Sequence, residues 1–268
     1  MSLSTKVSFL FIGAAVVVTA QQHLCSNSNG TYPATPWPVQ HTRLEAMFTP
    51  HEGNVWANKP IWYDYTNLHY RADSFYVSGE GNALTTLYNF SSVWKNQSLY
   101  MITYADKRSL QPESCIELQL GIGMMMPEWM LNGDCMGDVW STHKANGMDP
   151  NYYRAVWTRI SALDQDDGNF DWFSDYVTGA GYIMQAPGPD ADAYVINEEG
   201  PIVPATFSAD SPLFDIPSSL TCIPTEQVQS YSHLKDVLNK HKFPLTALNV
   251  LPEVRLAFHL SKMSAKKN

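Results

Sequence analysis

Short runs of β-branched and aromatic residues, separated by turn formers, recur along the chain between residue 40 and Cys222. Runs of this kind favour half-buried strands. The predicted strands are residues 61–66, 74–78, 99–104, 182–184, 193–196 and 205–207. Residues 99–104 have two candidate partners, residues 84–89 or the pair Val93 and Trp94. The second choice places Asn96 on a hairpin turn, where a glycan is easily carried.

A further hairpin is predicted from residues 153–160 and 170–177. The segment between them contains Asp167-Gly168, and glycine accepts the positive φ that tight hairpin turns require. The pattern as a whole therefore predicts a mainly β chain.

Helical patterns are sparse before Cys222 and more frequent after it. Residues 124–131 predict one short helix that stops at Gly133. After Cys222 the apolar spacing predicts an amphipathic helix from about Thr225 to His241, and one or two further helical turns before Pro252. The residues from Lys262 onward predict a frayed polar tail.

The first twenty residues resemble a secretory leader. Lys6 precedes an apolar run over residues 7–18, and the small residues Val18-Thr19-Ala20 predict cleavage before Gln21. The alternative is an uncleaved N-terminal anchor. A cleaved leader predicts a secreted, extracellular protein, or one in a lysosome-like lumen, with no stable membrane insertion after cleavage.

Charge divides the remaining chain into two parts. Residues 21–222, the predicted secreted β domain, hold 9 basic and 23 acidic side chains, and residues 223–268, a helical basic extension, hold 7 basic and 3 acidic ones. The acidic body argues against a nucleic-acid partner, because phosphates would be repelled.

Cysteines and glycosylation sequons fit an oxidising compartment. The four cysteines are Cys25, Cys115, Cys135 and Cys222. An even number in a secreted chain predicts two disulfides, and the residues alone leave three connectivities open. The sequons begin at Asn29, Asn89 and Asn96, and each predicts a surface position if glycosylated.

Catalytic motifs are missing from the sequence. There is no GxSxG, HExxH, GxGxxG or P-loop pattern, and the eight histidines have no metal-ligand spacing. An SxxK match at residues 92–95 is too short to be specific. We therefore predict a protein that is not an enzyme, while a secreted hydrolase whose triad assembles from distant residues stays an alternative.

A methionine-rich segment is the best candidate for ligand binding. Five methionines fall within thirteen positions from Met124 to Met136. Methionine side chains are flexible and adapt to varied apolar ligands. The predicted ligand-binding residues are Met125, Met126, Trp129 and Met130. An ordinary buried segment is the alternative.

The acidic turn at residues 164–169 is a candidate calcium site. Asp164, Asp166 and Asp167 cluster the carboxylates that calcium prefers, although the spacing is not that of an EF-hand. A solvated hairpin turn is the alternative. No other cofactor is predicted.

Several aromatic motifs resemble the second half of ependymin-related secreted proteins. The matching stretches are residues 152–154, 157–158, 170–179, 187–188 and 214–222. The resemblance implies a glycosylated, disulfide-bonded protein with a fold similar to bacterial lipoprotein carriers of the LolA type. That fold is a curved antiparallel sheet, or half barrel, closed over an apolar cavity by a few helices.

The same resemblance implies specific residues and ligands. It pairs Cys115 with Cys222, which leaves Cys25 and Cys135 to pair. Family members are linked to hydrophobic ligands and calcium, and they provide no catalytic residues. The family commonly has six cysteines, whereas this chain has four.

These observations predict a secreted glycoprotein that binds a lipid or fatty acid in a β-sheet cavity. An extracellular matrix or cell-surface interaction protein without a cavity is the main alternative.

Overall fold

The computed structural model describes residues 36–48, 56–80, 83–104, 111–141, 153–161, 169–175, 181–187, 193–198, 202–241, 243 and 252–267. Structural statements refer to these residues. The predicted leader (1–20), Cys25, Asn29, and the acidic residues Asp164, Asp166 and Asp167 lie outside them.

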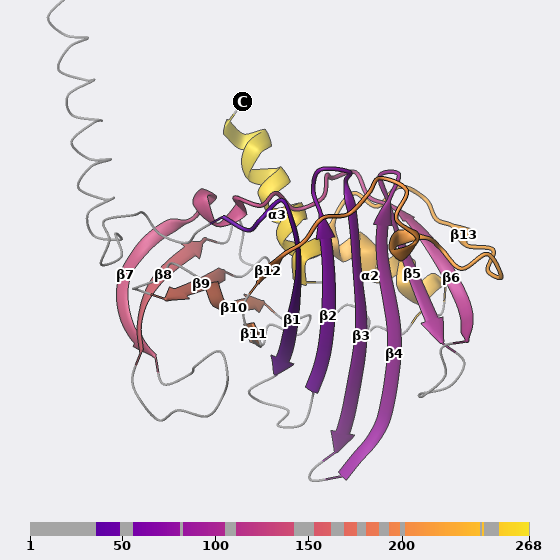
Figure 1. The fold of residues 1–268 in the computed structure, drawn as a ribbon, viewed down its shortest axis with the longest axis horizontal. Helices are drawn as coiled ribbons and strands as arrows, with labels where there is room; N and C mark the ends of the chain where they lie inside the picture. The colour runs from indigo at the N-terminus through magenta and orange to yellow at the C-terminus, as the bar shows by residue number, and fades with distance from the viewer. Residues whose placement is uncertain are drawn as a thin grey trace, which may run out of the picture.

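The described strands form one large sheet, which curves around two helices (Figure 1). The strands are β1 (Gln40–Phe48), β2 (Trp56–Asp64), β3 (His69–Glu80), β4 (Ala83–Lys95), β5 (Ser98–Tyr104), β6 (Pro112–Gln119), β7 (Asp134–Ser141), β8 (Tyr153–Ile160), β9 (Phe170–Asp175), β10 (Gly181–Pro187), β11 (Ala193–Glu198), β12 (Val203–Pro204) and β13 (Ile223–Pro224). Their order is β13-β6-β5-β4-β3-β2-β1-β11-β10-β9-β8-β7, with β12 beside β1. Neighbours are antiparallel except β13 and β6. The predicted fold class is confirmed.

The inner face of the sheet carries α2 (Tyr231–Lys240), α3 (Pro252–Lys267) and the 3-10 turn η1 (Trp129–Asn132). Helix α2 buries Leu234, Val237 and Leu238 in the same core as the strands. It lies within the predicted helical range. None of the helices in the described residues is long and apolar enough to cross a membrane.

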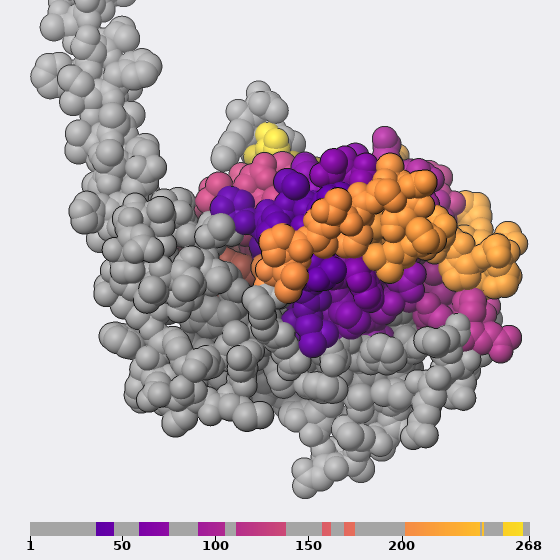
Figure 2. All heavy atoms as spheres, in the orientation of Figure 1, coloured from indigo at the N-terminus to yellow at the C-terminus, as the bar shows by residue number. Residues whose placement is uncertain are grey.

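A strap formed by residues 202–222 crosses the opposite, outer face of the sheet (Figures 1 and 2). Phe214, in the 3-10 turn η2 (Pro212–Phe214), is fully buried against Val93 and Ile102. The structure joins Cys115 of β6 to Cys222 at the end of the strap, with their Cα atoms 4.5 Å apart. This is the pairing that the resemblance implies. Cys135 is also disulfide-bonded.

Three local predictions are wrong. Residues 124–128 are not helical, and only η1 follows them, because the Tyr63 hydroxyl and the Trp37 backbone N–H donate hydrogen bonds to the carbonyls of Met125 and Pro127. Residues 205–207 form no strand. The one or two helical turns predicted before Pro252 fall at residues 244–251, which lie outside the described residues, and Pro252 itself begins α3, since proline is tolerated in the first turn. The predicted frayed tail is helical as far as Lys267.

Gly133 lies where two parts of the backbone approach closely. A Cβ atom there would sit 2.7 Å from Thr158 Cγ2 and 3.0 Å from the Arg159 carbonyl oxygen. We expect Gly133→Ala to destabilise the protein by about 1–3 kcal/mol, as overpacking does. Urea denaturation measures this, with Gly123→Ala as the control, since a Cβ at Gly123 meets nothing within 4 Å. Equal midpoints for the two variants would contradict the prediction.

Candidate functional site: an apolar pocket and a polar groove

A row of large side chains crosses the inner face of the sheet. Tyr63, Tyr70, Trp94, Leu99 and Leu118 are neighbours on β2 to β6, each paired in register with the next. All five are buried. Because side chains alternate between the two faces of a strand, this register places one continuous apolar surface beneath α3.

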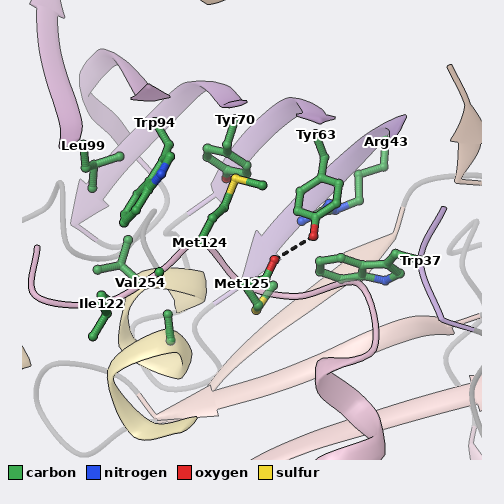
Figure 3. A pocket seen from close by; sticks show the side chains of 12 residues that line it. Trp37, Arg43, Tyr63, Tyr70, Trp94, Leu99, Ile122, Met124, Met125 and Val254 are labelled. Carbon is green, nitrogen blue, oxygen red and sulfur yellow. Dashed lines mark hydrogen bonds between the residues drawn. The ribbon is translucent and has the colours of Figure 1, made fainter. Parts of the chain in front are cut away.

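An apolar pocket lies between this row and the chain that covers it (Figure 3). Ile122, Met124 and Met125 line it from the covering segment, and Val254 and Ala257 line it from α3. The pocket volume open to the centre of a water molecule is about 30 Å³. That is space for one or two waters. An acyl chain would therefore need the covering side chains to repack.

The covering segment, residues 121–128, is held by hydrogen bonds to distant residues, one of them from the Gly121 N–H to the Val228 carbonyl at 3.2 Å. The Tyr63 hydroxyl donates to the Met125 carbonyl at 2.6 Å (Figure 3), and the Trp37 backbone N–H donates to the Pro127 carbonyl at 3.0 Å. Burial raises the pKa of Tyr63 well above its usual range, so this hydroxyl remains a donor. Methionine side chains above such a fixed backbone can still change rotamer.

Charged side chains are buried at one end of the pocket. Arg43, which lines the pocket, donates from Nε to Glu45 Oε1 at 2.8 Å, and Lys59 Nζ lies 2.8 Å from Glu45 Oε2. Arg43 Nη1 lies 2.7 Å from His41 Nε2, and its guanidinium stacks on Trp37 at 4.1 Å. This charged cluster (His41, Arg43, Glu45 and Lys59) is almost inaccessible to solvent.

Burial and neighbouring charges shift the pKa values of two groups in the charged cluster, Glu45 and His41. Burial alone raises the pKa of Glu45, but Lys59 and Arg43 outweigh it, and the net shift of the pKa is downward. Burial, followed by the charge of Arg43, lowers the pKa of His41 from 6.5 to about 3. His41 is therefore neutral in the folded protein at pH 7.

We expect acid to destabilise the protein through His41. The pKa of His41 is lower in the folded protein than in the unfolded chain. The contribution of His41 to the free energy of unfolding is therefore complete above pH 6.5 and is lost as the pH falls toward about 3. His41→Gln should reduce the slope of stability against pH in this window by up to about 1.4 kcal/mol per pH unit. Denaturation at several pH values measures this. Parallel wild-type and variant curves would contradict the prediction.

A polar groove opens beside the apolar pocket. It is bounded by the β4–β5 turn at Asn96 and Gln97, by Gln119 at the end of β6, and by Gln227. Its volume is about 890 Å³. The groove and the pocket share Trp94, Ile122, Gly123 and Met124, so these residues form the wall between them.

Leu68 is an unusual residue at the groove. It has a φ of 55° and is 46% exposed. A leucine rarely adopts a positive φ, and such strain is retained mainly at functional positions. Together with Tyr65 and Met124 it adds apolar surface to the lining of the polar groove.

The structure places the four predicted ligand-binding residues in different surroundings. Met125 lines the pocket, whereas Met126 is 37% exposed. Trp129 and Met130 are fully buried in the adjoining core. Met124, which lines both pocket and groove, was not among the predicted residues. Neither the aromatic residues of the sheet row nor the alternating residues His41, Arg43 and Glu45 carry a distinctive sequence signal, because exposed polar residues of a strand alternate in the same way.

The hairpin that brings Asn96 to the surface is confirmed. Trp94 pairs with Leu99 and Lys95 with Ser98, leaving Asn96 and Gln97 as a two-residue turn. Both turn residues are exposed. Asn89 lies within β4, where it pairs with Phe75 of β3. Within the described chain, no group of three His, Cys, Asp or Glu side chains is placed to hold a metal ion.

Comparisons with known proteins show similarity to solved structures only. No family model and no curated protein match the chain. An uncharacterised conserved protein from Thermus thermophilus is 5% identical, with a TM-score of 0.44, over 70% of this chain and 91% of that one. A beta-barrel-like protein of a domain of unknown function, DUF1849, from Brucella abortus is 8% identical, with a TM-score of 0.32, over 64% and 100%.

A LolA superfamily protein from Nitrosomonas europaea is also similar. It is 8% identical, with a TM-score of 0.28, over 69% of this chain and 92% of that one. At these scores the similarities assign neither a family nor a ligand to the chain. Membership of the ependymin-related proteins stays a prediction.

Proposed function

We propose that the protein binds an apolar chain, such as the acyl chain of a lipid or fatty acid, in the pocket beneath α3. The observation that carries this proposal is the cover of the pocket. Met124 and Met125 face a continuous aromatic row across a small apolar space (Figure 3). Thioether side chains can change rotamer to admit chains of different length. On this proposal the chain is a binding protein rather than an enzyme, and it acts after secretion.

The groove provides the route of entry in this proposal. The 890 Å³ groove adjoins the apolar pocket, since Trp94, Ile122, Gly123 and Met124 line both. An amphiphile would place its tail past Met124 and leave its polar head in the groove. Few, well-placed polar groups beside an apolar interior are typical of such sites.

An extracellular interaction protein with a solid core is the second candidate. The observation that favours it is the small volume of the pocket, about 30 Å³. Extraction and mass spectrometry of lipids from protein purified from its native secreted source separates the two functions. Stoichiometric bound lipid supports the carrier, and lipid-free protein that binds no added lipid supports the solid core.

Met125→Asp and Met126→Asp form a matched pair that tests the pocket. The two residues are adjacent, but only Met125 lines the pocket. A carboxylate beside the aromatic row should disfavour an acyl chain, so we expect Met125→Asp to weaken binding of a fluorescent fatty acid at least about tenfold, or about 1.4 kcal/mol. Met126→Asp should bind normally.

Folding of Met125→Asp must be checked by circular dichroism, because it places a charge in the core. Met124→Trp gives a second test, since it adds bulk to the wall between groove and pocket without adding charge. Undiminished binding by both folded variants would exclude the pocket as the site.

A further inference from the structure

Asn96 combines a glycosylation sequon with a position on the rim of the polar groove. Asn96 and Gln97 have φ values of 53° and 64°, which asparagine tolerates better than most residues. Asn96 is exposed, and its side chain lines the groove. The third residue of the sequon, Ser98, is buried and donates to Glu117 Oε1 at 2.8 Å. The sequon is thus held in a single, defined turn.

The lining of the groove suits a sugar. Gln97, Gln119 and Gln227 are exposed amides, and each offers both donors and acceptors to hydroxyl groups. Tyr65 and Leu68 supply apolar surface for the C–H face of a pyranose ring. No Lys, Arg or His is among the described residues that line the groove, so nothing there selects an anionic occupant.

We propose that the N-linked glycan on Asn96 folds back into this groove, where its first sugars contact Gln119 and Gln227. The modification forms a bond from the Asn96 side-chain nitrogen to C1 of the first sugar. The C1–O bond to a lipid-linked pyrophosphate breaks, and the nitrogen loses one proton. The oligosaccharide donor is supplied by the secretory compartment.

Because the glycan is attached at the rim of the groove, weak contacts are sufficient to keep it in the groove. A sugar attached at the rim has an effective concentration in the millimolar range or above, so it occupies the groove without tight binding. It then covers the exposed residues Gly121 and Gly123, of which Gly123 belongs to the wall between groove and pocket. The glycan would thereby slow access to the pocket, a consequence that rests on the proposed function.

Hydrogen exchange on the full, secreted chain tests the proposal. Mass spectrometry first measures occupancy of Asn96. The native protein is then trimmed to a single sugar by an endoglycosidase, which requires no refolding. We expect amide exchange over residues 119–124 and 225–229 to accelerate by about threefold or more on trimming. Exchange in the strap should not change.

Two sets of variants complete the test. Asn96→Asp removes the sequon with a residue that also tolerates a positive φ, and it should match the trimmed protein. Asn89→Asp removes the sequon that begins within β4 and should leave exchange near the groove unchanged. Replacing Gln119 and Gln227 together with alanine, with the glycan retained, should also accelerate exchange.

Three outcomes would overturn the proposal. They are an unmodified Asn96 in a chain glycosylated at another sequon, identical exchange before and after trimming, and an alanine double variant indistinguishable from wild type. None of these measurements uses an apolar ligand, so they stand whether or not lipid binds. Faster uptake of a fluorescent fatty acid after trimming is the separate readout of access.

Discussion

Glu45→Gln should destabilise the protein by about 3–5 kcal/mol, the usual result of removing one partner from a buried ion pair. Glu45 is 2% exposed and lies 2.8 Å from both Arg43 Nε and Lys59 Nζ. Glutamine keeps the shape of the side chain but removes the charge that two buried cations share. Chemical denaturation at neutral pH gives the change in the free energy of unfolding.

Glu226→Gln is the matched control. Glu226 also pairs with a lysine, Lys240, at 2.9 Å, but both side chains are more than half exposed. Solvent screening makes such pairs weak, so this variant should have the same denaturation midpoint as the wild type. If Glu45→Gln also has the denaturation midpoint of the wild type, the charged cluster contributes nothing to stability. Its role at the end of the pocket would then need another explanation.

Replacing Cys115 and Cys222 together with serine should cost about 4–5 kcal/mol, because the disulfide closes a loop with a sequence separation of 107 residues. It should also release the strap from the outer face. We expect amide exchange across residues 202–222 to increase strongly, since the disulfide fixes the end of this segment to β6.

Lys95→Ala is the control for the strap. It removes a partly exposed ion pair to Asp215 of the strap and should cost only about 0–1 kcal/mol. A double cysteine variant as stable as Lys95→Ala, with an unchanged strap, would show that packing around Phe214 is sufficient to hold this segment.

The sequence predicted the fold class because many strands carry short aromatic and β-branched runs. Strand β1 was missed, since its buried face carries His41, Arg43 and Glu45 rather than apolar residues. Strand β6 was missed for a related reason: it contains Glu113 and Glu117. A charge buried in a cluster cannot be told from an exposed charge by periodicity alone.

The candidate site was only partly predictable. The sequence pattern indicates that the methionine-rich segment is a candidate for ligand binding, and Met125 lines the pocket. Its helical conformation was wrong, because hydrogen bonds to Pro127 and Met125 from distant residues override the local pattern. The aromatic row depends on the register of five strands, which a single sequence does not specify.

Quenching of tryptophan fluorescence by a brominated fatty acid tests the central claim most directly, because bromine quenches only at close range. Trp37 and Trp94 line the pocket beneath α3. We predict saturable quenching that unlabelled fatty acid reverses, that weakens in Trp94→Phe, and that disappears in Met125→Asp but not in Met126→Asp. A folded wild-type protein that shows no saturable quenching, or quenching that Met125→Asp leaves intact, would contradict binding in this pocket.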